Sequence, residues 1–537
     1  MKKKIGLLAS LALIFYGCNQ KIDTPKLAVF ISIDQLGQEV FAHYQDLYTG
    51  GYEWFLENGV WFTNVEHEHW YCATAPGHFV LSSGRHPVHG NVFGNYQFDR
   101  ELNQIVSSVA DTLSKITGSA KIGRSYRNIP TTTLGDWLKF KHPKSKVISV
   151  AGKDRAAILM AGKNPDAVVW WNWEGQFVTS DYYTKDNPTW LTQFNENSDF
   201  LKYRDSLWTR ELDTEIYEKY TRSDHFTGEI DVSDKNEYSP TFPIAFDKNL
   251  TDLQVLDNLA NGPWLDYETV HLSQSIVENE ELGLDNNPDI LFIGLSGTDV
   301  IGHNFGPFSN EAMDYQLKLD KKLNSFIKYL DHQIGLKNVL FVLTGDHGVL
   351  PLPEYLNNIK NVEAGRIDRQ EYYARRDSAL SEIEKLFGKE IVYTDFNKFY
   401  YNYAKLAELN ITNSDIDNIL RPALRNVEGI GEILTKDEIL TGDSNNKLIR
   451  RFQNHTHPKN GPDLVAIPKK YWTFRYPRGA THGTPYKYDS NVPFIIASEG
   501  LKSETIDKYY GAVNIAPTIA KILGLPIPEV VDGVPIY

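Results

Sequence analysis

The sequence predicts an α/β fold with a mostly parallel central sheet flanked by helices on both faces. Six short apolar runs, rich in β-branched residues, are typical of buried strands: 27–33, 147–150, 167–171, 290–295, 339–343 and 492–497. Helical patterns such as residues 311–329 and 376–386 lie between several of these runs. Strands that alternate with helices build a parallel sheet that is covered on both faces.

Two stretches fit this alternation poorly. Residues 173–261 are polar and aromatic, and residues 357–477 mix helical patterns with short strand-like pieces. We expect both stretches to be insertions over the catalytic face of one domain that spans residues 18–537, rather than independent domains.

The composition is that of a globular protein. The chain has 537 residues, of which 41% are hydrophobic and 23% are charged, and its formal net charge is −14. A strongly negative protein has no general affinity for the nucleic acid backbone, so we expect no nucleic acid partner. We expect the protein to be a monomer.

Residues 1–17 resemble a signal peptide of the lipoprotein type. Three lysines precede an apolar run at residues 5–16 that is too short to span a bilayer comfortably, and Gly17-Cys18 follows. We therefore expect export to the periplasm or anchoring in the outer membrane through a lipid on Cys18. An ordinary signal peptide with a chance cysteine is the alternative. The other cysteine, Cys72, would then have no disulfide partner and is expected to be a small buried residue.

Polar residues follow the ends of the predicted strands. Asp34 comes directly after the first strand, Lys153 follows the second, and Asp346-His347 follow the strand that ends at residue 343. In sheets of this kind ligands bind beyond the carboxyl ends of the strands. These side chains are therefore candidates for one shared site.

Further candidate metal ligands occur at short spacings. Asp299 and His303 are four residues apart, so on a helix their side chains share one face and can bind one ion. Glycines flank Asp346-His347, and they also border His482, which allows tight loops at both places. Each motif alone is weak, because an aspartate at a strand end is commonly a helix cap or a turn residue.

Taken together and in order, these motifs resemble the alkaline phosphatase superfamily, specifically its PafA-type phosphate-irrepressible branch. The sequence presents Asp34, then TAPGH at 74–78, Asp299 with His303, DHG at 346–348 and HGT at 482–484. The resemblance implies two zinc ions. The first would be bound by Asp299, His303 and His482, and the second by Asp34, Asp346, His347 and the Thr74 oxygen.

The resemblance also implies a catalytic role for Thr74. Thr74 would attack the phosphorus of a phosphate monoester, and water would then hydrolyse the phosphothreonine. Coordination by a metal favours the alkoxide of a hydroxyl group, and Ala75, Pro76 and Gly77 favour a helix whose first amides attract an anion. The alternative is that Thr74 only caps that helix.

Three further residues match positions that bind substrate in this branch. Asn95 corresponds to an asparagine that donates a hydrogen bond to a phosphoryl oxygen. Lys153 and Arg155 match a Lys-x-Arg pair, and two cations would favour the extra charged oxygen of a monoester. The expected substrates are therefore small-molecule phosphate monoesters.

Several other functions are less consistent with these residues. A nucleotide pyrophosphatase/phosphodiesterase would share the zinc ligands, Thr74 and Asn95, but not the Lys153/Arg155 pair. A sulfatase needs a C-x-P-x-R motif where this chain has TAPGH, and a cofactor-independent phosphoglycerate mutase would be cytoplasmic and use a serine. From another class, a glycan-binding lipoprotein could use Trp170, Trp171 and Trp173 as a stacking platform. The other histidines are expected to be structural or to lie on the surface: His67, His69, His86, His89, His455 and His457.

Overall fold

The computed structural model describes residues 24–230 and 241–537. The predicted signal peptide and Cys18 lie outside the described residues. Within them, no helix is both long enough and apolar enough to cross a membrane.

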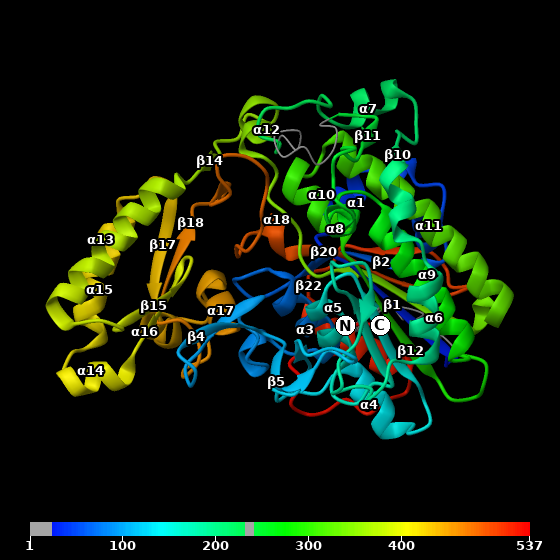
Figure 1. The fold of residues 1–537 in the computed structure, drawn as a ribbon, viewed down its shortest axis with the longest axis horizontal. Coiled ribbons are helices and arrows are strands. Elements are labelled where there is room, and N and C mark those ends of the chain that lie inside the picture. Colours follow the sequence, from blue (N-terminus) through cyan, green and yellow to red (C-terminus); the bar gives the residue numbers. More distant parts are fainter. Residues whose placement is uncertain (1–23, 231–240) are drawn as a thin grey trace, which may run out of the picture.

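The main sheet has ten strands, and its centre is parallel (Figure 1). Its five central strands run in the order β13 (Val339–Gly345), β1 (Leu27–Ile33), β12 (Asp289–Leu295), β7 (Val147–Ala151) and β8 (Ala167–Trp171), and each pair of neighbours is parallel. On the far side of β13, β20 (Asn491–Ala497) and β2 (Gly59–Glu66) add antiparallel pairs. Short strands complete the edges: β9 (Phe177–Val178), β21 (Glu504–Ile506) and β22 (Tyr510–Gly511). All six predicted strands are confirmed, and β2 is an additional strand.

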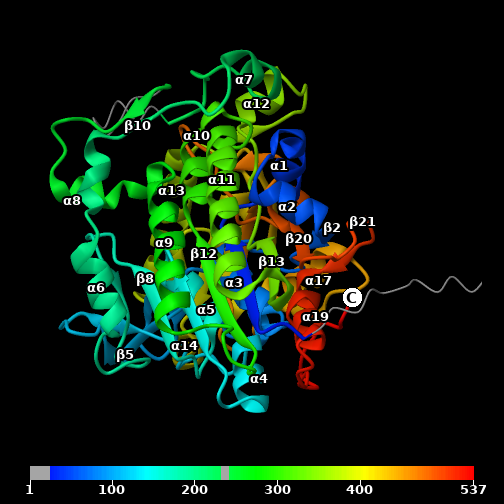
Figure 2. The same cartoon turned by 90° about the vertical axis from the view of Figure 1, so that its right-hand side faces the viewer.

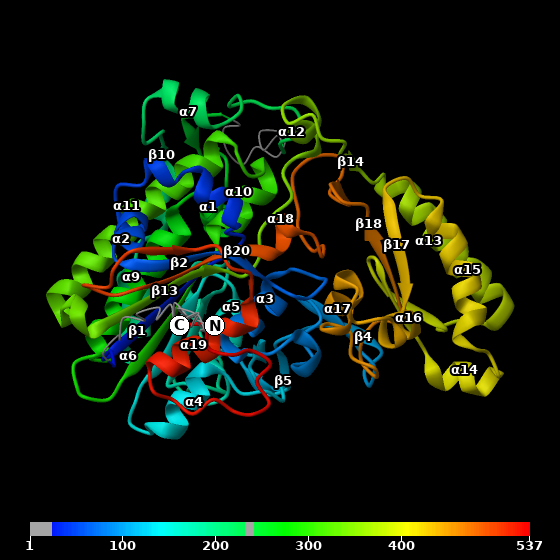
Figure 3. The ribbon, with the colours of Figure 1, turned by 180° about the vertical axis from the view of Figure 1, so that it is seen from behind.

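Alternate residues of β1 enter two different hydrophobic cores, one on each face of the sheet. Val29 and Ile31 pack with α2 (Gly51–Glu57), α9 (Trp264–Asn279) and α11 (Asn310–Ile334), which lie along one face (Figure 2). Ala28 and Phe30 pack with α3 (Thr74–Ser83), α4 (Leu134–Lys141), α5 (Asp154–Ala161) and α19 (Ile515–Ile522) on the other face (Figure 3). Burial on both faces explains why the central strands are almost wholly apolar in sequence.

The stretch at 173–261 contributes aromatic side chains to the core that contains Val29. It contains α6 (Thr189–Asn197), β10 (Leu207–Trp208), α7 (Thr214–Tyr220), β11 (Ile244–Ala245) and α8 (Asp252–Asp257). Trp190, Phe200 and Trp208 from this stretch are buried in that core. Trp170 and Trp171 are also buried, in β8, and Trp171 contacts the rings of Phe177 and Phe200. Trp173 is partly buried and packs against the same core. Because Trp170 and Trp171 lie inside the protein, the three tryptophans form no exposed platform for glycans, and that hypothesis is wrong.

The stretch at 357–477 forms a second sheet with a hydrophobic cluster of its own. Its antiparallel strands are β15 (Val392–Asp395), β16 (Lys398–Tyr401), β18 (Leu464–Pro468) and β17 (Ile430–Thr435), in that order. Helices α13 (Arg369–Phe387) and α15 (Asn413–Arg425) pack on this sheet through buried residues such as Tyr372, Ile383 and Leu420. This second lobe lies beside the main sheet, at the left of Figure 1. The prediction of one domain with insertions stays a prediction.

Candidate metal centre and active site

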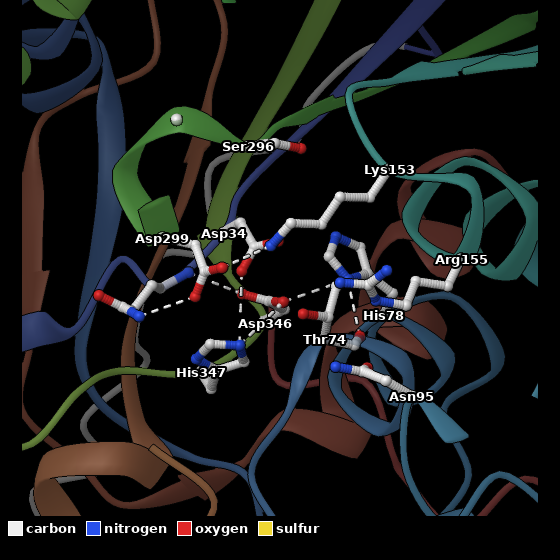
Figure 4. Close-up of polar contacts among 12 residues, drawn as sticks. Asp34, Thr74, His78, Asn95, Lys153, Arg155, Ser296, Asp299, Asp346 and His347 are labelled. Atoms are coloured by element: carbon white, nitrogen blue, oxygen red, sulfur yellow. Dashed lines mark hydrogen bonds and ion pairs between the residues drawn. The ribbon is translucent and has the colours of Figure 1, made fainter. Parts of the chain in front are cut away.

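The predicted ligands meet at the carboxyl edge of the main sheet (Figure 4). Asp34 directly follows β1, and Asp346-His347 directly follow β13, the neighbouring strand. Asp299 and His303 lie on α10 (Gly297–Phe305), which begins after β12 on the other side of β1. Because β13, β1 and β12 are adjacent and parallel, the three segments that follow them converge.

Two groups of donor atoms could each hold an ion. Atoms of Asp299, His347 and His482 lie within 4.8 Å of one another, and so do atoms of Asp34, Asp346 and His347. The imidazole rings of His347 and His482 stack, with their centroids 3.7 Å apart. His347 therefore belongs to both groups.

His303 joins the group around Asp299. The side-chain nitrogens Nε2 of His303 and His482 lie 3.2 Å and 3.5 Å from Asp299 Oδ1. Asp299 and His303 are one turn apart on α10, as the spacing predicts. The structure thus brings together all six Asp and His residues that the resemblance assigns to metal.

Backbone carbonyls orient all three histidines in the same way. The Nδ1 atoms of His303, His347 and His482 lie 2.9, 2.9 and 2.8 Å from the carbonyl oxygens of Ala480, Gly348 and Cys72. A carbonyl can only accept, so each Nδ1 carries the proton, and each Nε2 is left as a free lone pair when the ring is neutral. This is the usual orientation of metal-binding imidazoles. Cys72 itself is buried, as predicted, and has no disulfide partner among the described residues.

Three buried atoms of the candidate ligands at this edge have no hydrogen bond among the described residues, and one of them is Asp346 Oδ2. The other two, Asp34 Oδ1 and His347 Nε2, lie 3.4 Å apart. Unpaired buried polar atoms are costly and rare in folded proteins. A cation between a carboxylate oxygen and an imidazole nitrogen would satisfy both atoms, and this donor set suits zinc.

Burial and neighbouring charges shift the pKa values of the carboxylates and of His347. Burial, followed by the Asp346 carboxylate, raises the pKa of Asp34 to about 7. Burial also acts to raise the pKa of Asp346, but His347 and His78 outweigh it and hold that pKa below its ordinary value. Burial lowers the pKa of His347 to about 3, so its ring is neutral at physiological pH. Strongly shifted pKa values in a cluster are typical of functional sites.

Thr74 is the first residue of α3, where the sequence predicts a helix to begin, and it is buried. The amide of Ala75 donates a hydrogen bond to Asn95 Oδ1 at 2.9 Å. This bond fixes the Asn95 side chain beside the start of α3. Because the Asn95 oxygen accepts from Ala75, the orientation of the side-chain amide group is fixed, and its nitrogen remains available as a donor.

Lys153 and Arg155 reach the site in different ways. Lys153 Nζ is buried between Asp34 Oδ2 and Asp299 Oδ2, at 2.6 Å from each. Figure 4 shows the Arg155 side chain pointing toward Thr74 and Asn95. Of the predicted pair, Arg155 therefore lies near Thr74, whereas Lys153 contacts two candidate metal ligands.

The sequence interpretation missed Gln35 and a role for His78. The backbone amide of Gln35 donates to Asp346 Oδ1 at 2.9 Å, and its side-chain Nε2 donates to Asp299 Oδ1 at 2.7 Å. Gln35 therefore positions one carboxylate of each group. His78 Nδ1 lies 2.8 Å from the Thr74 carbonyl and 3.2 Å from Asp346 Oδ2. Gln35 could have been predicted from its position next to Asp34, the aspartate at the end of the first strand. His78 lies within the TAPGH motif, but the sequence alone does not show that its side chain contacts Asp346.

A parallel sheet with Asp and His groups at its carboxyl edge, next to a helix headed by threonine, defines the alkaline phosphatase-like class of α/β proteins. The chain belongs to the type I phosphodiesterase / nucleotide pyrophosphatase family, whose model matches residues 28–491. The resemblance to the PafA-type branch of the alkaline phosphatase superfamily is confirmed by the relatives.

Several relatives match nearly the whole chain. It is 28% identical to alkaline phosphatase PafA of Elizabethkingia meningoseptica, over 99% of this chain and 97% of that protein. It is 29% identical to alkaline phosphatase PhoV of Synechococcus elongatus, over 95% of this chain and 92% of that protein. The crystal structure of PafA superposes with a TM-score of 0.86 at 27% identity, covering 96% of this chain and 99% of that chain. A PafA variant with threonine replaced by serine, and asparagine, lysine and arginine by alanine, superposes with a TM-score of 0.87.

Proposed function

We propose that this protein is a two-zinc alkaline phosphatase that hydrolyses phosphate monoesters through a phosphothreonine on Thr74. The observation that carries the proposal is the pair of Asp/His groups that share His347 at one sheet edge. Several relatives that match nearly the whole chain, among them PafA and PhoV, are named alkaline phosphatases, and the chain is a phosphoric monoester hydrolase.

The ligand assignment is the one that the family resemblance implies, and the closeness of the six side chains supports it. Asp299, His303 and His482 would hold one zinc ion, and Asp34, Asp346 and His347 would hold the other, with the Thr74 oxygen as a further ligand. Zinc at these positions would favour the alkoxide of Thr74 and neutralise charge on the leaving oxygen.

The protein's own groups position the phosphoryl group. The Thr74 oxygen attacks phosphorus, and the first amides of α3, a ten-residue helix, attract the anion. Asn95 donates from its amide nitrogen to a phosphoryl oxygen, since its Oδ1 accepts from Ala75. Arg155 supplies a guanidinium that can bind two phosphoryl oxygens at once.

The solved PafA variant supports this choice of residues. Its threonine and asparagine are 21 positions apart and its lysine and arginine two apart, the separations of Thr74 from Asn95 and of Lys153 from Arg155. The same four residue types thus recur at the same local spacings in a relative with the same fold.

The alternative is a nucleotide pyrophosphatase/phosphodiesterase, the activity for which the matching family is named. The substrates of the two enzymes differ at one phosphoryl oxygen. In a monoester this oxygen carries a negative charge, and in a diester it carries a second substituent. Lys153 and Arg155 both extend into the site, and cations there favour the monoester.

The deciding experiment compares kcat/KM for an aryl phosphate monoester and its bis-aryl diester, with zinc present. The double variant Lys153→Ala/Arg155→Ala should lower the monoester value by about 10²–10³, as expected for lost electrostatic contacts to the transition state. The diester value should fall far less. Lys163→Ala is a matched control, because Lys163 follows the same helix, α5, and its ammonium donates to the Pro130 carbonyl.

A parallel fall of both activities would contradict the monoesterase assignment. Zinc content must be measured for every variant, because Lys153 contacts two proposed ligands and its loss could change metal binding instead of substrate selection.

Export, a lipid on Cys18 and a monomeric state belong to the same proposal. Export and the lipid are supported by the basic and apolar start of the sequence that ends in Gly17-Cys18. N-terminal analysis of the mature protein and its mass in solution test them; a chain that retains residues 1–17 would contradict export.

A further inference from the structure

A cavity of about 270 Å³ lies beside His482, between the main body and the second lobe. Tyr71, Leu350 and residues 481–484 of the main body line one side of the cavity, next to the proposed zinc site, and residues of the second lobe line the other side. A cavity of about 150 Å³ can hold benzene. This cavity can therefore hold one aromatic ring with a substituent.

The wall from the second lobe is aromatic. Phe396, Trp472 and Phe474 line it, and the rings of Phe396 and Phe474 meet edge to face at 4.8 Å. Such a wall favours a flat ring over a flexible chain.

Two arginines, Arg369 and Arg475, also line the cavity. Neither has a carboxylate within ion-pair distance among residues 24–230 and 241–537. The Arg369 guanidinium donates to Tyr373 Oη at 2.7 Å and lies 5.5 Å from the centre of the Phe396 ring. Both guanidinium groups therefore retain donors for a ligand.

The neighbouring Arg366 shows the contrast. It forms a two-bond ion pair with Glu354, with both nitrogen–oxygen distances 2.8 Å. Its third guanidinium nitrogen, Nη1, donates to the carbonyls of Arg475 and Gly479 at 2.8 Å and 2.7 Å, which holds that loop in place. Arg366 is thus paired and structural, whereas Arg475 is held at the cavity without an anion.

Arg475 also lies close to the proposed zinc site. A side chain at Gly479 would place its Cβ 3.1 Å from Arg475 Nε and 2.6 Å from the carbonyl of His303. Burial lowers the pKa of Arg475, and the nearby charges of Arg369 and Arg366 lower it further. A bound anion would relieve this repulsion.

We propose that this cavity, the arginine pocket, binds the alcohol part of the substrate, and that Arg369 and Arg475 select aromatic alcohols that carry a second negative charge. The inference rests on the proposed phosphatase function and narrows its substrate class. The phosphoryl group would be held at Thr74, and the ring would lie against Phe396 and Trp472 with its anion at the two guanidinium groups.

The test uses two substrates of nearly equal size, 4-carboxyphenyl phosphate and its neutral analogue 4-carbamoylphenyl phosphate. The zinc-loaded wild-type enzyme should have the higher kcat/KM for the carboxylate. In Arg369→Gln/Arg475→Gln, which keeps most of the side-chain bulk, kcat/KM for the carboxylate should fall at least about tenfold. The neutral substrate should change less than about threefold. Arg478→Ala is the control, because Arg478 is exposed on the same loop and does not line the cavity.

A second measurement does not depend on turnover. By calorimetry, 4-hydroxybenzoate should bind the wild-type protein at least about tenfold more tightly than 4-hydroxybenzamide, and the double variant should lose this preference. Equal binding of the two alcohols, or an equal loss of activity on both substrates, would overturn the inference while leaving the phosphatase function intact. If the enzyme hydrolysed neither substrate, the proposed function would fail, and the binding measurement alone would decide the pocket.

Discussion

Thr74 is held by contacts on both sides of its peptide. Its carbonyl lies 2.8 Å from His78 Nδ1, and the next amide donates to Asn95. Both contacts involve the backbone, so the position of the Thr74 oxygen does not depend on its own hydroxyl. A change confined to that side chain therefore removes the nucleophile without removing its support.

We accordingly expect Thr74→Ala to fold normally and to lose nearly all turnover. No hydrogen bond of the Thr74 hydroxyl to the helix occurs in the described residues, and even a lost cap would cost only about 0.5–2 kcal/mol. The measurement is kcat, together with mass spectrometry of acid-quenched enzyme for phosphate on Thr74. Thr133→Ala is a suitable control, because Thr133 caps α4 away from the site. Normal turnover in Thr74→Ala would rule out the phosphothreonine.

At the level of single residues, the sequence predicted that the candidate metal ligands lie together, but it did not predict the contacts of the cations. Asp34, Asp299 and Asp346 could be predicted to meet because strand ends in a parallel sheet share an edge. The contacts of Lys153 could not, because a lysine at a strand end can reach either a substrate anion or a carboxylate. Only the three-dimensional structure shows two carboxylates within 2.6 Å.

Among the elements, α3 and the loop after β13 are packed with almost no space between them. A Cβ at Gly77 would lie only 2.2 Å from the backbone oxygen of Asp346. The glycine of the TAPGH motif therefore lets the helix that carries Thr74 approach the loop that carries Asp346 and His347.

Gly77→Ala should consequently separate the two elements. Alanine favours a helix by about 1 kcal/mol over glycine, so α3 should persist, but a shift of about 1 Å between catalytic groups can cost about 100-fold in rate. We expect kcat/KM to fall by about that factor, with weaker zinc binding and an unchanged far-ultraviolet circular dichroism spectrum. Ser83→Ala, at the far end of the same helix, should change none of these. Full activity in Gly77→Ala would show that the site tolerates the shift.

The prediction of strands and their directions was incomplete in two cases. In one the apolar pattern is interrupted, and in the other the pairing strands lie far apart in the sequence. The strand β2 escaped notice because Thr63 and Asn64 interrupt its apolar run at a bulge between Phe62 and Val65. β20 was predicted as a strand, but its antiparallel direction depends on β13 and β2, which lie far away in the sequence. Local pattern fixes the existence of a strand more firmly than its pairing.

Across the whole molecule, the two sheets have separate hydrophobic cores. The main sheet is buried between two clusters, whereas the second lobe packs around residues such as Tyr372, Ile416 and Leu464. Its sheet joins β16 to β18, whose residues are more than sixty positions apart, so the sequence showed strand-like pieces there without showing one sheet. The proposed zinc ligands lie on the main body, and the second lobe contributes the arginine pocket beside them.

The separation of the two cores predicts which segments should lose stability when the metal is removed. Zinc that binds only the folded state stabilises it by mass action, and its removal would leave Asp34 Oδ1 and His347 Nε2 buried and unpaired. Chelation should therefore accelerate amide hydrogen exchange at the carboxyl ends of β1 and β13 and in α10. The amides of β16 and β18 should change little, because their cluster contains none of the ligands.

The experiment is hydrogen exchange by mass spectrometry, before chelation, after it and after zinc is restored. In Asp34→Asn, exchange at β1 and β13 should already be fast and should respond weakly to the chelator, which links the effect to this site instead of to the chelator itself. Equal acceleration in both sheets would show that the chain unfolds as one cooperative unit. If zinc-loaded and chelated wild-type protein exchanged alike at β1, β13 and α10, there would be no stabilising metal at this edge, and the two-zinc assignment would be wrong.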